Sequence, residues 1–197
     1  MGQAMKRIAV YCGSATPADP CYIETAQLVG RTLAARGIGL VYGGGKLGLM
    51  GAVANAVLDA GGDVIGVIPE ALVGSEVAHT GCTELHVVPG MHERKRMFTD
   101  LSDGFLTIPG GVGTMDELWE AISWAQLGYH QKPVGLLNAA GFYDKLLEFN
   151  AHMVSVGFIR AQHKDILIAD NDLDQLLERM ATYKPHQTIF AMKAKDL

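Results

Sequence analysis

The chain has 197 residues, of which 49% are hydrophobic and 19% charged, as in an ordinary globular protein with one sizeable core. Its formal net charge of −5 argues against a general nucleic-acid or membrane-surface binder, while leaving room for a local basic patch that holds one small anion. No segment approaches the roughly 18 apolar residues of a membrane span. Three cysteines without a C-x-x-C pair predict a reduced, cytoplasmic protein without a structural zinc site.

Short apolar runs alternate with amphipathic segments along the chain. Runs rich in Val, Ile and Leu without polar alternation are typical of strands buried on both faces of a parallel sheet. We expect such strands at 7–12, 38–43, 63–69, 84–89, 104–109, 133–138 and 165–169. Helices are expected at 20–36, 47–61, 91–102, 115–127, 143–156 and 173–183. This alternation predicts an α/β fold: one Rossmann-like domain over residues 1–197, with a doubly wound parallel sheet of about seven strands and helices on both faces.

In such sheets, ligands bind outside the carboxyl ends of the strands, where the strand order reverses. The expected strand ends carry five segments that could contact a ligand, at 12–17, 42–51, 68–74, 88–95 and 108–114. Two of them are rich in glycine, and we call them the first glycine loop (43–48) and the second glycine loop (109–114).

The first glycine loop contains Gly43, Gly44 and Gly45, and the spacing Gly43-x-Gly45-x-x-Gly48 resembles a dinucleotide-binding fingerprint. That fingerprint normally follows the first strand and precedes an acidic residue that binds the ribose. Here the loop follows the second expected strand, and Glu70, directly after a proline, is a poor copy of that acid. NAD binding is therefore the disfavoured interpretation.

The second glycine loop, "PGGVGT", joins a strand to a helix. Bare backbone N–H groups at a helix N-terminus attract anions, with help from the helix dipole. Two such loops in one sheet favour a single phosphate held from two sides. The alternative is that both glycine clusters only permit tight turns with positive φ. The candidate phosphate-binding residues of this loop are Gly110, Gly111, Val112, Gly113 and Thr114.

Glu117 has two interpretations. Thr114-x-x-Glu117 matches a capping box, in which Thr114 caps the helix and the glutamate reaches back to the Thr114 N–H. From spacing alone the cap is favoured. The catalytic alternative places the carboxylate one turn from a phosphate loop, beside the sugar of a bound nucleotide, where it could steer water or stabilise positive charge.

The segment "MHERKRMF" at 91–98 places Arg94 and Lys95 in the first turn of a helix, where cations oppose the helix dipole. Either an anionic ligand explains this placement or the run is a solvated charged face. His92 is a candidate acid or base, although a lone histidine more often has a structural role. Glu76 faces either the pocket or solvent, and spacing does not decide between them.

The motifs "PGGVGTMDE" at 109–117 and "MHERKRMF" at 91–98 resemble the P-G-G-x-G-T-x-x-E and M-x-x-R-K signatures of the Lonely Guy (LOG) family of cytokinin-activating enzymes. The segments "YGGGKLGLMGAVA", "WAQLGYHQKPVGLLN" and "GFYDKLL" are similar to that family too, so the resemblance runs from about residue 8 to 170. It implies a nucleoside 5′-monophosphate phosphoribohydrolase that cleaves the N-glycosidic bond of N6-substituted AMP or AMP, without cofactor or metal. The products are the free base and ribose 5-phosphate.

Carried onto this sequence, the resemblance makes Arg94 and Glu117 the catalytic pair, so that Glu117 both caps and catalyses. It implies further substrate contacts, which are Lys95, Gly110, Gly111, Val112, Gly113, Thr114, Gly43, Gly44, Gly45, Met91 and Glu76. It also implies a homodimer, with larger assemblies in some members. A "lysine decarboxylase" label fits poorly, because nothing suggests a pyridoxal phosphate site.

A protein that binds a nucleotide or molybdenum cofactor without cleaving it is the rival interpretation. Both interpretations predict AMP binding, but only the hydrolase predicts base release that depends on Arg94 and Glu117. Residues 75–83 differ from the plant members' version, which leaves the preferred base open. The biological role, the rate and the choice between dimer and hexamer do not follow from the sequence.

Overall fold

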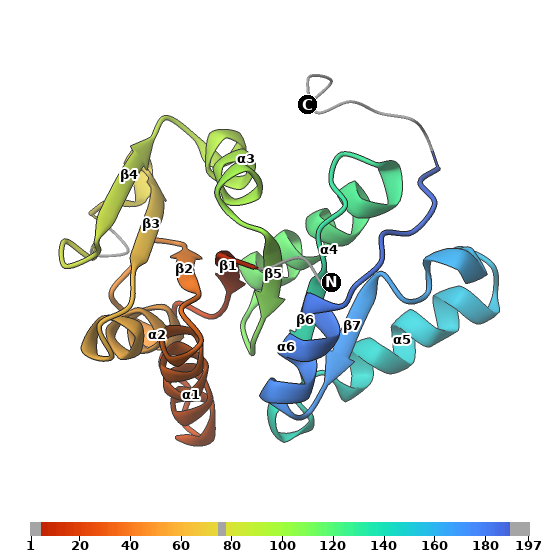
Figure 1. The fold of residues 1–197 in the computed structure, drawn as a ribbon, viewed down its shortest axis with the longest axis horizontal. Coiled ribbons are helices and arrows are strands. Elements are labelled where there is room, and N and C mark those ends of the chain that lie inside the picture. Colours follow the sequence, from red (N-terminus) through yellow and green to blue (C-terminus); the bar gives the residue numbers. More distant parts are fainter. Residues whose placement is uncertain (1–4, 75–77, 190–197) are drawn as a thin grey trace.

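The computed structural model describes residues 5–74 and 78–189. Within these ranges one sheet of seven parallel strands carries helices on both faces, which confirms the predicted fold class (Figure 1). The strands are β1 (Arg7–Tyr11), β2 (Gly39–Tyr42), β3 (Val64–Pro69), β4 (Glu84–Val88), β5 (Gly104–Thr107), β6 (Val134–Leu137) and β7 (Leu167–Asp170). The helices are α1 (Cys21–Ala35), α2 (Gly48–Asp59), α3 (Met91–Leu101), α4 (Val112–Leu127), α5 (Asp144–Ser155) and α6 (Leu173–Ala181).

Alternating side chains of the strands divide the core into two layers. In β1, Ile8 and Val10 join the cluster formed with α1, α2 and α6, whereas Ala9 and Tyr11 join the cluster formed with α3 and α4. All four residues are at most 5% exposed. This burial on both faces explains why the strands read as unbroken apolar runs in the sequence.

The strand order β4-β3-β2-β1-β5-β6-β7 reverses at β1. The chain runs outward from β1 through β2 and β3 to β4, and α3 then returns it to β5 on the other side of β1 (Figure 1). The connections that leave β1 and β5 therefore diverge, and a crevice opens between the carboxyl ends of these two strands. Both glycine loops reach this crevice.

One boundary differs from the prediction in a way that matters for function. Helix α4 was expected from residue 115 but begins at Val112, with the extended Gly111 as its N-cap. Thr114 is therefore the third helical residue and Glu117 the sixth, in the second turn. The capping box predicted for these two residues is wrong, since neither stands at the position that the motif requires.

Thr114 is drawn into the helix because it packs tightly beneath the loop. Its side chain is only 4% exposed and lies directly against Gly110. A Cβ at Gly110 would collide with the Thr114 hydroxyl and come within 2.8 Å of the Gly13 nitrogen. The helix thus starts at Val112, two residues after this close contact.

Candidate active site

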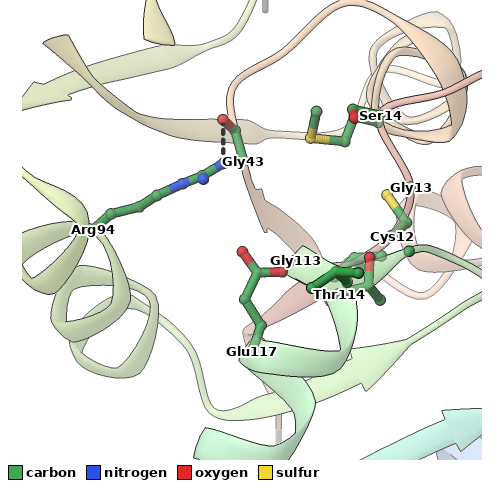
Figure 2. A pocket seen from close by; sticks show the side chains of 12 residues that line it. Cys12, Gly13, Ser14, Gly43, Arg94, Gly113, Thr114 and Glu117 are labelled. Carbon is green, nitrogen blue, oxygen red and sulfur yellow. Dashed lines mark hydrogen bonds between the residues drawn. The ribbon is translucent and has the colours of Figure 1, made fainter. Parts of the chain in front are cut away.

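Three strand-to-helix connections meet at the crevice. The Gly13 N–H donates to the Pro109 carbonyl at 3.1 Å, and the Leu49 N–H donates to the Gly13 carbonyl at 3.1 Å, so the β1, β2 and β5 connections are bonded together. They enclose a cavity of about 170 Å³ (Figure 2). Its lining residues are Val10, Cys12, Gly13, Ser14, Gly43, Met50, Arg94, Gly111, Val112, Gly113, Thr114 and Glu117.

The second glycine loop presents backbone to this cavity. Intrahelical bonding in α4 begins with the Met115 N–H, which donates to the Gly111 carbonyl at 3.1 Å, so the first-turn N–H groups precede it. A Cβ added at Gly111 or Gly113 would meet nothing within 4 Å. Neither residue, nor Gly110, has a positive φ. The positive-φ explanation therefore fails for this loop, and what its open glycines provide is accessible backbone at a helix N-terminus.

Glu117 extends from the second turn of α4 into the cavity (Figure 2). Together with burial, its negative charge raises the pKa of two buried neighbours. Burial raises the pKa of the Cys12 thiol, and the Glu117 carboxylate raises it further. Burial and the same carboxylate also raise the pKa of the Tyr11 hydroxyl. Glu117 thus places negative charge in a partly enclosed space, where such charge acts strongly on a ligand.

Arg94 reaches the cavity from α3, toward the same space as Glu117 (Figure 2). It is only 6% exposed. Its Nε donates to the Val67 carbonyl at 3.1 Å and its Nη2 to the Gly43 carbonyl at 2.9 Å. The guanidinium also lies 5.5 Å from the centre of the Phe98 ring. Arg94 therefore bonds to β3 and to the residue that follows β2 while it forms one wall of the cavity.

The structure brings together seven of the residues predicted for the site: Arg94, Glu117, Gly43, Gly111, Val112, Gly113 and Thr114. Gly110 lines an adjoining apolar cavity and not this one. Met91 contacts the Arg94 guanidinium through its sulfur, and Gly45 pairs with Ala78. Gly44 bonds its carbonyl to the His79 N–H at 2.8 Å. Glu76 lies outside the described residues.

Lys95 takes a different direction from Arg94. Its ammonium lies 2.9 Å from a carboxylate oxygen of Asp116 and 3.0 Å from one of Glu120, both on α4. It does not line the cavity. His92 likewise lines a separate groove between α3 and α4. Of the pair Arg94–Lys95, only the arginine faces the crevice.

Cys12, Gly13 and Ser14 line the cavity, and they belong to the strand-end segment 12–17 that could contact a ligand, although none was predicted individually as a site residue. The sequence signal for them was their place after the first expected strand, next to the reversal of strand order. Met50, on the first turn of α2, also lines the cavity; it lies in the strand-end segment 42–51 but was not predicted individually as a site residue.

Two other kinds of site are absent from the part of the chain that the structure describes. No helix within residues 5–74 and 78–189 is long and apolar enough to cross a membrane. In the same ranges, no group of three or more His, Cys, Asp or Glu side chains is arranged to hold a metal ion.

Similar proteins were found by sequence. The model of a family described as "Possible lysine decarboxylase" matches residues 50–180. The chain is 47% identical over 184 residues to the cytokinin riboside 5′-monophosphate phosphoribohydrolase LOG of Oryza sativa subsp. japonica, covering 93% of this chain and 76% of that one. A phosphoribohydrolase of the same description from Arabidopsis thaliana is 44% identical over 180 residues, covering 91% of this chain and 79% of its own.

Similar structures were found as well. The molybdenum cofactor binding protein from Rippkaea orientalis matches with a TM-score of 0.66 at 21% identity, over 89% of this chain and 94% of that one. The molybdenum cofactor carrier protein from Chlamydomonas reinhardtii matches with a TM-score of 0.64 at 21% identity, over 89% of this chain and 99% of that one. At this identity the likeness concerns the fold alone. The sequence relatives decide the family, and the chain belongs to the LOG family of cytokinin riboside 5′-monophosphate phosphoribohydrolases.

Proposed function

We propose that this protein hydrolyses the N-glycosidic bond of a nucleoside 5′-monophosphate, with N6-substituted AMP or AMP as substrate. The single observation that supports the proposal best is one cavity that combines the open N-terminus of α4 with the Glu117 carboxylate. A helix N-terminus with open N–H groups binds an anion such as phosphate. The Glu117 carboxylate, in the second turn of the same helix, then lies beside the part of the ligand that carries the phosphate.

The substrate phosphate would bind at the first turn of α4, to the N–H groups of Val112, Gly113 and Thr114. This places the ribose over the second turn, near Glu117. The phosphate is remote from the reacting bond, so its binding energy serves to position the sugar. In this arrangement, the second glycine loop is a phosphate-binding loop and the enzyme acts as an AMP nucleosidase when the base is unsubstituted.

In the reaction, the bond between C1′ and the base nitrogen breaks, and the base leaves with the electron pair. The ribose then carries positive charge, which the Glu117 carboxylate stabilises. Water adds to C1′, with Glu117 as the base that accepts its proton. The departing base takes up a proton from solvent and Glu117 releases the proton of the attacking water, so the step balances and the products are the free base and ribose 5-phosphate. Arg94 fixes the opposite wall of the cavity through the Gly43 and Val67 carbonyls.

The test is release of free base from AMP and from isopentenyladenosine monophosphate by wild type and by Glu117→Gln. Because Glu117 is the sixth residue of α4 and no capping box exists, the substitution leaves the start of the helix untouched. We expect wild type to release base and the folded variant to be at least about 100-fold slower. Glu178→Gln, on the exposed side of α6, is the matched control and should keep wild-type activity.

A carrier that binds a nucleotide or cofactor without cleaving it is the competing proposal. If folded wild type binds AMP, measured by calorimetry, yet releases base from neither nucleotide, the carrier proposal replaces the hydrolase. If base is released but Glu117→Gln is as fast as wild type, hydrolysis stands and the role of Glu117 falls.

We also propose that the protein is a homodimer. Helices α4 and α5 form an apolar groove of about 470 Å³ between Met115, Trp119, Phe149 and Met153. Phe149 is 56% exposed, and Val112, one turn before Met115 at the rim of the active-site cavity, is 89% exposed. A second copy would cover this surface. Sedimentation of wild type and Phe149→Glu tests it, with a shift to monomer expected only for the variant.

A cytoplasmic location is the remaining part of the proposal. All three cysteines are free thiols in the structure, which fits a reducing compartment. Fractionation of cells that express the tagged chain tests this location, and recovery in the membrane or secreted fraction would contradict it.

A further inference from the structure

Lys95 was expected to contact the substrate, but its surroundings indicate another role. Its side chain is 12% exposed and its ammonium is held between Asp116 and Glu120. These two acids are four residues apart and so share one face of α4. Together the three groups carry two negative charges and one positive, a net charge of minus one. The cluster itself therefore offers a phosphate no net positive charge.

This ion-pair cluster joins the two helices that supply the proposed catalytic pair. Arg94 precedes Lys95 on α3, and Glu117 lies between Asp116 and Glu120 on α4. Arg94 is fixed to β3 and to the residue after β2 by its bonds to Val67 and Gly43. Helix α4 instead follows β5, on the other side of β1. The cluster therefore links, outside the cavity, the two helices from which Arg94 and Glu117 reach it.

The ammonium remains charged in this setting. Burial alone would lower the pKa of Lys95, but the bonds to Asp116 and Glu120 outweigh it and hold the pKa above its ordinary value. The Lys95 ammonium therefore carries its positive charge at neutral pH.

We propose that Lys95 is a positioning residue that sets the spacing of Arg94 and Glu117 by tying α3 to α4, and that it does not bind the substrate phosphate. The inference rests on the proposed hydrolysis, in which Glu117 acts on the sugar. A misplacement of about 1 Å between reacting groups lowers a rate by roughly 100-fold, so a bridge between the helices affects turnover more than binding.

The experiment measures kcat and KM for AMP, together with inhibition by ribose 5-phosphate and by inorganic phosphate. Lys95→Met removes the ammonium but keeps the unbranched chain. We expect its kcat to fall about 10- to 100-fold, with KM and both inhibition constants within about twofold of wild type. Lys95→Arg should restore most of kcat, because a guanidinium also reaches two carboxylates.

A variant of the two acids that bind Lys95, here called the partner variant, best separates a positioning role from a phosphate-binding role. The double substitution Asp116→Asn and Glu120→Gln leaves Lys95 in place but removes what it binds. A positioning role predicts a loss of kcat like that of Lys95→Met, and no further loss when all three substitutions are combined. A phosphate-binding role predicts unchanged or tighter inhibition by inorganic phosphate, because the ammonium is released.

Asp174→Asn is the matched control, since it removes another ion pair between helices, with Arg36, on the opposite face of the sheet. It should keep wild-type kcat.

The inference is overturned if Lys95→Met raises KM and the phosphate inhibition constant tenfold or more while kcat holds, or if all variants match wild type. Base release by wild type is required first, and its absence would refute the proposed hydrolysis instead. Thermal unfolding identifies any variant that fails to fold, in which case Lys95→Arg and the partner variant decide.

Discussion

The two glycine loops look alike in the sequence but differ in what their glycines do. In the first loop, Gly44 has a φ of +76° and Gly43 makes room for the Arg94 guanidinium and the Met50 sulfur. In the second, Gly111 and Gly113 have ordinary φ values and open space around them. The first loop is thus shaped to fit its own protein, whereas the second is shaped to leave backbone bare for a ligand. Only Gly110, which is packed against Thr114, departs from this division.

The largest effect is expected at that exception. In Gly110→Ala the methyl group would collide with the Thr114 hydroxyl and lie 2.8 Å from the Gly13 nitrogen. Backbone must then move, at about 3 kcal/mol of unfolding free energy, and the connections from β1 and β5 would separate. We expect loss of base release together with the loss of stability. Urea unfolding and the base-release assay measure both, and a stable, active Gly110→Ala would show that the contact with Gly13 is dispensable.

Low pH should weaken the packing of α4, the helix that begins in the second loop, more than the packing of the first loop. His130 is 6% exposed; its Nε2 bonds to the Ala121 carbonyl of α4 at 2.9 Å, and its Nδ1 accepts from the Lys132 N–H at 3.2 Å. Burial lowers its pKa to about 4, against the bond to Ala121, which raises it, and with help from the Lys132 charge. The ring is therefore neutral in the folded protein and supports α4 in that form.

The sign of the effect follows from that pKa. The unfolded chain binds the proton near pH 6.5, before the folded protein does, so this contribution is complete above about 6.5 and is lost as the pH falls toward 4. About 2 kcal/mol of unfolding free energy should be lost at pH 5 from this residue. Urea unfolding of wild type and His130→Gln at pH 7 and pH 5 isolates it. Equal pH dependence in the two proteins would refute the assignment.

A smaller effect is expected in the first loop. In Gly43→Ala the methyl group would meet the ends of two side chains, those of Arg94 and Met50, which can move aside. Stability should fall by only about 1 kcal/mol, since no backbone is displaced. The moved guanidinium would alter the cavity wall, so kcat should fall about tenfold. Kinetics and urea unfolding together test this, and a stability loss as large as that of Gly110→Ala would contradict the contrast between side-chain and backbone contacts.

The sequence predicted the fold well because a strand that is buried on both faces is a continuous apolar run. Such a run can be recognised from a short stretch of sequence, without knowledge of tertiary contacts. The loop positions followed from the same pattern, since they stand at strand ends. The direction of Lys95 could not be predicted in this way. Neighbouring residues on a helix point about 100° apart, and only the packing of α3 against α4 decides that Arg94 faces the crevice while Lys95 faces Asp116 and Glu120.

The start of α4 was missed for a related reason. Thr114 and Glu117 carry the letters of a capping box, and local spacing favours that motif over an earlier start at a sequence containing two glycines. The loop in which Gly110 meets Thr114 is held by the bond from the Gly13 N–H to the Pro109 carbonyl, and Gly110 also lies against the Gly13 nitrogen, nearly 100 positions away in the sequence. These tertiary contacts prevail over the local preference. The same contacts explain why Gly13 and Ser14 belong to the cavity although no motif marks them.

The smallest expected effect has the opposite sign and tests the second loop directly. Gly113 is the second residue of α4, and a Cβ there would meet nothing within 4 Å. Gly113→Ala should therefore stabilise the protein by about 0.5 kcal/mol, because alanine favours the helix. The same methyl group would stand beside the N–H groups proposed to bind phosphate, so KM for AMP should rise about tenfold while kcat changes little. A variant that is more stable yet binds AMP as tightly as wild type would mean that the phosphate lies elsewhere. A more stable variant that binds AMP more weakly would show that Gly113 serves the ligand and not the fold. If glycine were needed there for folding, its replacement by alanine would lower stability.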